Sequence, residues 1–199
     1  MSFKLGEKTV RISFLFAVFF AVAANLTGGK NVLLSFFFAL VHEGVHIVFL
    51  HMAGVKRADV VLLPAAVKIS CEGLNLLSYK KTVLCTMCAP VFNIVTGAVF
   101  ALLYCIFPLE NIKICAAVNL VPGIINLLPM EFLDGGRAMK AFLSQKYDEE
   151  KVRFVMKRLS TVSLIFLFSA FFIGCTIGKM QVFLLIFCVY CLVGSFSDK

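Results

Sequence analysis

Residues 32–53 read VLLSFFFALVHEGVHIVFLHMA, an apolar run that carries three histidines and a glutamate between positions 42 and 51. About 20 consecutive apolar residues are enough to cross a bilayer as a helix. An ionisable side chain at mid-membrane depth costs about 2.5–3.5 kcal/mol on insertion scales, so such residues by default mark a function. This stretch therefore predicts a membrane-spanning helix with a chemical site inside it.

The spacing His42-Glu43-Gly44-Val45-His46 suits a metal site. Positions i and i+4 share one face of a helix, so both imidazoles can reach one ion. Glu43 follows the first histidine and can hold the water that the metal polarises. The alternative, two buried histidines beside a chance glutamate, is disfavoured by the insertion cost. His51, near the end of the run, is interpreted as an interfacial residue.

The whole composition is that of a membrane protein. The 199 residues are 61% hydrophobic, whereas soluble domains are about 45–50% apolar. The prediction is one intramembrane domain over residues 1–199, all-α and polytopic. About six transmembrane helices are expected, at residues 12–26, 32–53, 82–107, 112–128, 159–177 and 182–196.

The basic residues predict the orientation. With the N-terminus inside, sixteen of the nineteen Lys and Arg residues fall on the inner side, and only Lys30, Lys113 and Lys179 on the outer side. This asymmetry follows the positive-inside rule and predicts that both termini are cytoplasmic. It also explains the net charge of +8 without a nucleic-acid partner. A cleaved signal peptide is the alternative for the first apolar run.

Two connecting segments are too polar to span. Residues 60–64 and 67–72 predict two short extended stretches around a turn, a small β-hairpin-like segment at the cytoplasmic interface. The alternative is a surface loop. Residues 137–158 are the most charged stretch, and Asp148-Glu149-Glu150-Lys151 indicates the start of a cytoplasmic helix that leads into the fifth span.

A catalytic zinc site usually has three protein ligands and one open position. The candidates for the third ligand are Asp134 and Glu131, in the segment NLLPMEFLDGGR, residues 126–137. Pro129 interrupts the fourth apolar run, and two glycines allow a tight turn. Irregular backbone at membrane depth is tolerated where protein buries it or water reaches it. From the residues alone, Asp134 is favoured over Glu131.

Taken together, these motifs resemble the site-2 protease family of intramembrane metalloproteases. The matching features are His42-Glu43-x-x-His46, Ala89-Pro90-x-x-Asn93, and Asn126-x-x-Pro129 followed by Leu133-Asp134-Gly135-Gly136. The six-span plan is similar to the subgroup of stage IV sporulation protein FB. That subgroup often has a C-terminal nucleotide-sensing CBS domain, which is not expected here because the sequence ends at Lys199.

The resemblance implies a single catalytic Zn²⁺ held by His42, His46 and Asp134, with Glu43 as the catalytic residue. It also implies that Asn126 and Asn93 support the substrate or the oxyanion, although either amide could instead bond between helices. The expected function is zinc endopeptidase cleavage of membrane-bound regulatory proteins in a bacterial cell membrane, with an inhibitory membrane partner as a further expectation. The alternative is a zinc-binding membrane protein without protease activity, either a transporter or an inactive scaffold.

Overall fold

The computed structural model describes residues 2–5, 8–12, 29–55, 58–63, 66–71, 77–176, 185, 188–189 and 191–192. Within it the chain divides into two compact units, Met1–Ile125 and Asn126–Lys199. Of the predicted span 12–26 only Ile12 is described, and of the predicted span 182–196 only five residues are described.

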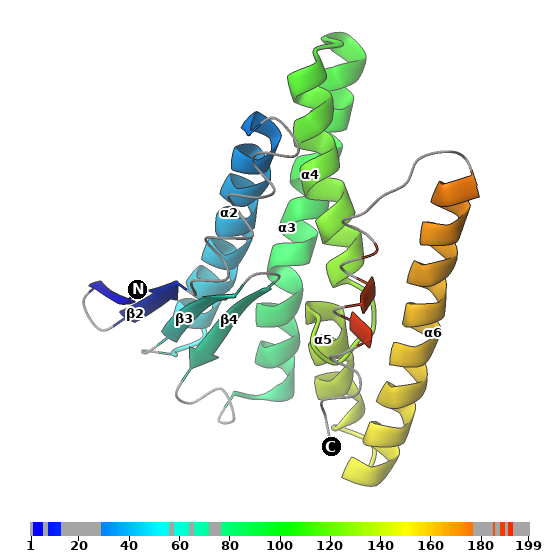
Figure 1. Cartoon of the computed structure of the whole chain (residues 1–199). Coiled ribbons are helices and arrows are strands. Elements are labelled where there is room, and N and C mark those ends of the chain that lie inside the picture. Colours follow the sequence, from blue (N-terminus) through cyan, green and yellow to red (C-terminus); the bar gives the residue numbers. More distant parts are fainter. Residues whose placement is uncertain are drawn as a thin grey trace. The chain divides into compact units, whose positions relative to one another are not determined.

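Three helices of the first unit correspond to predicted spans (Figure 1). They are α2 (Lys30–Met52), α3 (Tyr79–Ile106) and α4 (Glu110–Asn126). Among the described residues, α2 from Asn31, α3 and the later helix α6 (Glu149–Thr176) are long and apolar enough to cross a membrane. Their exposed residues include many large hydrophobic side chains, such as Phe37, Leu102 and Phe166. The expectation of a helical membrane protein is met at this level, with three candidate spans.

The end of α2 is fixed by a Schellman motif. Gly54 has a φ of 97°, its N–H donates to His51, and the N–H of Val55 donates to the Leu50 carbonyl. This left-handed turn satisfies carbonyls that the helix end would leave without partners. Val55 and Leu50 then pack with Cys85 of α3 in one buried cluster. The turn therefore sets where α2 meets α3.

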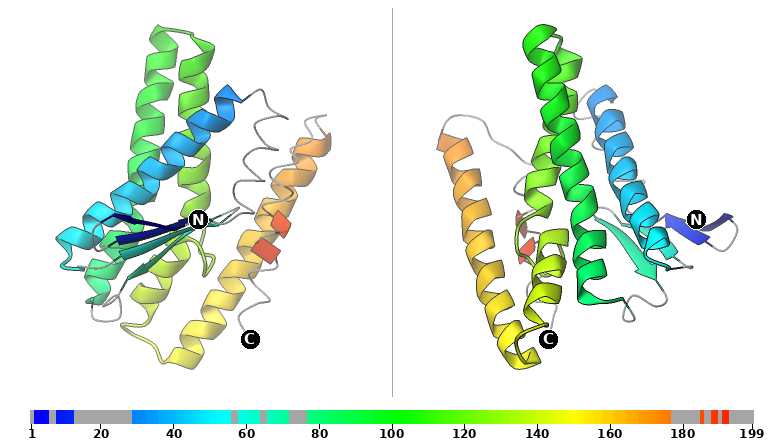
Figure 2. Two further views of the ribbon diagram at one scale, coloured as in Figure 1. Left: turned by 60° about the vertical axis from the view of Figure 1, so that its left-hand side comes forward. Right: turned by 180° about the vertical axis from the view of Figure 1, so that it is seen from behind.

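Small residues bring α3 and α4 close together, and the two helices run side by side in Figure 2. A Cβ added at Gly97 would lie 2.6 Å from Leu120, and one at Gly123 would lie 3.2 Å from the Cβ of Asn93. Glycine at a membrane helix interface permits such close packing. Each helix thus contributes an Asn-x3-Gly pattern to the contact, Asn93 with Gly97 and Asn119 with Gly123.

A four-stranded sheet corrects the expectation of an otherwise all-α chain. Its order is β1 (Ser2–Leu5), β2 (Lys8–Ile12), β3 (Ala58–Leu63) and β4 (Ala66–Cys71). β3 and β4 are antiparallel and occupy the segment for which extended stretches were predicted. β1 and β2 were not predicted, and Ile12 had been placed in the first span. The alternation in residues 2–12 is a strand signal, but their three basic residues were interpreted only as an orientation signal.

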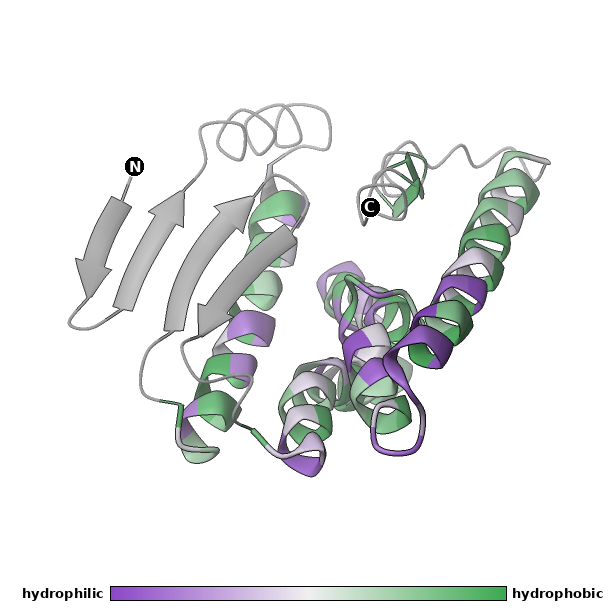
Figure 3. Ribbon diagram, turned by 90° about the horizontal axis from the view of Figure 1, so that it is seen from below, coloured by the Kyte–Doolittle hydropathy of each residue, from purple (hydrophilic) through white to green (hydrophobic). Residues whose placement is uncertain are grey.

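The second unit contains the short helix α5 (Asp134–Leu143) and the long helix α6, which contact one another. α6 joins the predicted cytoplasmic helix start and the predicted fifth span in one helix of 28 residues. Figure 3 shows hydrophilic residues at its beginning and hydrophobic residues along the rest. The helix at residues 134–143 was not predicted from the sequence.

Candidate metal centre

The two histidines of the HEGVH motif lie on one face of α2. His42 is 6% exposed and His46 is 7% exposed, and their ring centroids are 4.9 Å apart at an interplanar angle of 85°. The i, i+4 spacing on a helix produces this proximity. The two buried imidazoles therefore lie close enough together to bind one metal ion.

A hydrogen bond from α3 defines the chemical state of His46. Its Nδ1 lies 2.8 Å from the backbone carbonyl oxygen of Cys85. A carbonyl can only accept, so Nδ1 carries the proton and donates it, which leaves the lone pair on Nε2 to serve as a metal ligand. Metal-binding histidines commonly use such an outer partner to fix the tautomer and the ring orientation.

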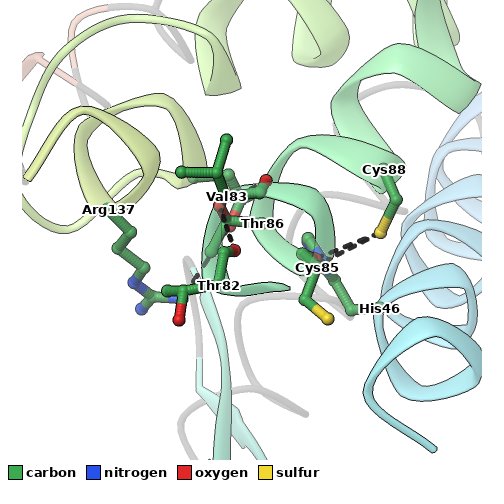
Figure 4. Close-up of polar contacts among 8 residues, drawn as sticks. His46, Thr82, Val83, Cys85, Thr86, Cys88 and Arg137 are labelled. Carbon is green, nitrogen blue, oxygen red and sulfur yellow. Dashed lines mark hydrogen bonds and ion pairs between the residues drawn. The ribbon is translucent and has the colours of Figure 1, made fainter. Parts of the chain in front are cut away.

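The thiol of Cys88 lies beside the same hydrogen bond (Figure 4). Its Sγ is 3.8 Å from His46 Nδ1 and donates to the Cys85 carbonyl at 3.1 Å. Sequence reasoning did not select Cys85 or Cys88 as part of the site. The signal was present in the spacing Cys85-Thr86-Met87-Cys88 one helix after the motif.

Asp134 is presented at the start of α5 by a tightly packed loop. Its residue is 8% exposed, and the loop ends with the N–H of Leu133 donating to the Met130 carbonyl at 2.8 Å. A Cβ added at Gly135 would overlap the backbone of Leu127, and one at Gly136 would overlap the carbonyl of Met130. The two glycines are therefore needed because the loop backbone lies directly on the first turn of α5.

The structure separates the two acidic candidates. The Glu131 carboxylate forms an ion pair with Lys140, and its side chain is 33% exposed. Asp134 is buried, and its Oδ1 lies 3.8 Å from Nη1 of Arg137. The ammonium group of Lys140 competes with any metal ion for the Glu131 carboxylate. The surroundings of Glu131 therefore suit a metal ligand less well than those of Asp134.

His42, His46 and Asp134 form a group that could hold a metal ion, and all three are buried. One ligand atom from each lies within 4.8 Å of the others. Two ligands on one tetrahedral zinc ion, each bonded at ~2.0–2.1 Å, lie about 3.4 Å apart. Two imidazole nitrogens and one carboxylate are a usual catalytic donor set for zinc, so the residues fit this ion. No other such group occurs among the residues that the structure describes.

The remaining predicted residues differ in their surroundings. Glu43 is partly exposed beside the two histidines, and Asn126 ends α4 and is also partly exposed. Asn93 is 2% exposed, and its Oδ1 has no hydrogen-bond partner among the described residues. His51 is exposed and lies outside the three-residue group. Asn119, which sequence reasoning did not select, is fully buried and also has an amide oxygen without a described partner.

The fold and this group of residues define a class: a helical membrane protein with a His-His-Asp centre. Among solved structures, the chain is similar to the "Site-2 Protease from Methanocaldococcus jannaschii", with a TM-score of 0.70 over 100% of this chain and 95% of that chain. The two sequences are 21% identical, so the likeness establishes a shared fold. No protein-family model and no curated protein matches the chain.

Proposed function

We propose that the chain is an intramembrane zinc endopeptidase. The observation that carries the proposal is the buried His-His-Asp group, within which His46 is oriented by the Cys85 carbonyl. The site-2 protease fold and the partly exposed Glu43 next to the group support the same assignment. His42, His46 and Asp134 would hold the ion, and Glu43 would act as the general base.

The reaction is peptide-bond hydrolysis. A zinc ion bound by these residues would polarise the substrate carbonyl and lower the pKa of a water molecule toward neutrality. Glu43 accepts a proton from the attacking water and transfers it to the leaving amine. His46 stays in one tautomer because its Nδ1 keeps its proton and donates a hydrogen bond to the Cys85 carbonyl. Asn126 and Asn93 offer amide groups to the substrate backbone or to the developing oxyanion.

The substrate would be a membrane-bound regulatory protein. A spanning helix keeps its carbonyls in internal hydrogen bonds, so the cleaved segment must unwind first. β4 is an outer strand of the sheet, since the order is β1-β2-β3-β4. An unwound segment can add to such an edge through backbone hydrogen bonds. This pairing would hold the segment extended for cleavage.

The sheet supports the cytoplasmic orientation. β2 pairs in parallel with β3, so residues 8–12 and 58–63 belong on the same side of the membrane. Between β2 and β3 the chain must return to the side of the membrane from which it left. It therefore crosses the membrane an even number of times between these strands. α2, about 34 Å long, can supply one of these. Together with the charge asymmetry, this pairing supports the proposal that the sheet and both termini lie in the cytoplasm.

The test combines cleavage and metal content. Single-span tagged membrane proteins are co-expressed with the wild-type chain, Glu43→Gln or His46→Ala, and zinc per purified chain is measured in parallel. We expect fragments only with the wild type, bound zinc in the wild type and Glu43→Gln, and loss of zinc in His46→Ala. Equal cleavage by Glu43→Gln would overturn the mechanism. Bound zinc without any cleavage would instead favour a transporter or an inactive scaffold.

A further inference from the structure

Residues 142–158 repeat one contact three times. Lys146 lies over the ring of Phe142 at 5.7 Å, Lys151 over Tyr147 at 4.3 Å, and Arg158 over Phe154 at 4.3 Å. In each pair the cation follows the aromatic residue by four positions. The rings are exposed, at 51%, 43% and 56% respectively. We call residues 142–158 the basic–aromatic segment.

This arrangement is unusual for a surface facing only water. An exposed ring adjacent to a cation gains from the cation–π attraction, but its apolar area remains in contact with solvent. A membrane interface accommodates both parts, because the ring lies among the headgroups and upper chains while the cation reaches outward. The three pairs therefore indicate contact with a lipid surface.

The segment leads directly into an apolar helix face. The buried residues Val152, Met156 and Ser160 mark the side of α6 that packs inside the protein. Arg158 lies away from that side, and the exposed residues that follow it include Val162 and Ile165. Residues 159–176 of α6 contain no charged side chain, and 18 helical residues extend about 27 Å. The boundary between headgroup and hydrocarbon therefore falls just after Arg158.

The charge of the segment selects the lipid. Five basic residues, Lys146, Lys151, Arg153, Lys157 and Arg158, accompany three acidic residues in consecutive positions, Asp148, Glu149 and Glu150. The acidic residues lie at the beginning of α6, where they complement the helix dipole. Glu149 also pairs with Arg153 at 3.6 Å. The three ring-bound cations have no acidic partner among the ion pairs of the described residues.

We propose that the basic–aromatic segment binds the headgroups of anionic phospholipids in the leaflet that α6 enters. The cations donate hydrogen bonds to headgroup phosphates, and the rings hold them at headgroup depth. Each basic residue near an anionic surface strengthens binding by about fivefold at moderate salt. The proposal rests on the membrane placement within the proposed function but does not depend on protease activity.

The experiment uses the absence of tryptophan from the chain. Phe154→Trp introduces a single fluorophore into the segment of the full-length protein, which is reconstituted in phosphatidylcholine vesicles containing phosphatidylglycerol. Bromine is carried on the chains of one lipid or the other, at matched bromine content, and the quenching of Trp fluorescence is compared. From the quenching we expect a relative binding constant for phosphatidylglycerol at least fivefold higher than that for phosphatidylcholine. This ratio should fall at high salt.

Two triple variants in the same background distinguish the segment from the total charge. Replacing Lys146, Lys151 and Arg158 by Gln is expected to bring the ratio of the binding constants for phosphatidylglycerol and phosphatidylcholine close to one. Replacing Lys80, Lys81 and Lys113 by Gln removes the same charge elsewhere and should leave the preference unchanged. Equal quenching by both lipids in the Phe154→Trp protein would overturn the inference. Quenching by neither lipid would overturn the membrane placement itself.

Discussion

The choice between Asp134 and Glu131 depends on single contacts that the sequence does not contain. Both carboxylates lie in one irregular segment, and either could be a ligand on spacing alone. The ion pair of Glu131 with Lys140, together with the burial of Asp134, distinguishes them. The proximity of the two histidines could be predicted without any tertiary contact, because their i, i+4 spacing on a helix fixes their geometry. The sequence therefore predicted the HEGVH half of the site more firmly than the acidic half.

Substituting the two carboxylates tests this distinction. Asp134→Ala should lose tightly bound zinc, because a charged ligand disappears from a three-ligand centre. Glu131→Gln should retain zinc and lower stability by only ~0–1 kcal/mol, since its ion pair with Lys140 is partly exposed. Zinc per chain and the thermal unfolding midpoint in detergent are the measurements. Full zinc retention by Asp134→Ala would assign the third ligand elsewhere.

At the scale of elements, the sequence predicted the helices that are defined by long apolar runs. It did not predict α5, which depends on tertiary contacts. The helices at 32–53, 82–107 and 112–128 were predicted close to their observed bounds. α5 was not predicted, because glycine at its second and third positions has a low helix propensity and favours a turn. Those glycines are required by the loop backbone of Leu127 and Met130 lying against them.

A matched pair of glycine substitutions tests this account of α5. A Cβ at Gly136 would overlap the Met130 carbonyl, whereas one at Gly44 in α2 meets nothing within 4 Å. Gly136→Ala should therefore lower the free energy of unfolding by about 2 kcal/mol or more and weaken zinc binding, since the loop must move. Gly44→Ala should be neutral or stabilising by up to about 1 kcal/mol. Unfolding in detergent, with zinc analysis, compares them, and equal effects would contradict this explanation.

The outer edge of β4, the last strand in the sheet order, gives a second prediction at this scale. Proline cannot donate a backbone hydrogen bond, so Val67→Pro with Ile69→Pro should strongly reduce cleavage of a membrane substrate. The control, Val67→Thr with Ile69→Thr, keeps the N–H groups and the strand propensity and should retain most activity. Cleavage rates and bound zinc are measured for both. Undiminished cleavage by the proline variant would exclude strand addition as the way the substrate is held.

For the whole molecule, orientation is the property on which the charge count and the sheet agree. The positive-inside asymmetry depends on every loop, whereas the parallel pairing of β2 with β3 depends only on residues 8–12 and 58–63. The pairing argues only that these two segments share one side of the membrane, and the charge count is what predicts that this side is the cytoplasm. The sequence alone could not predict the pairing, because strand partners distant in the chain are selected by the packing of the helices between them.

Reporter fusions along the chain test that orientation. Alkaline phosphatase is active only after export, and a fluorescent protein that folds only in the cytoplasm gives the complementary signal. A fusion after Pro108, between α3 and α4, should give high phosphatase activity and little fluorescence. A fusion after Ser144, at the end of α5, should give the reverse, because the neighbouring basic residues resist export. The opposite pattern would place the sheet outside the cell and contradict the predicted orientation.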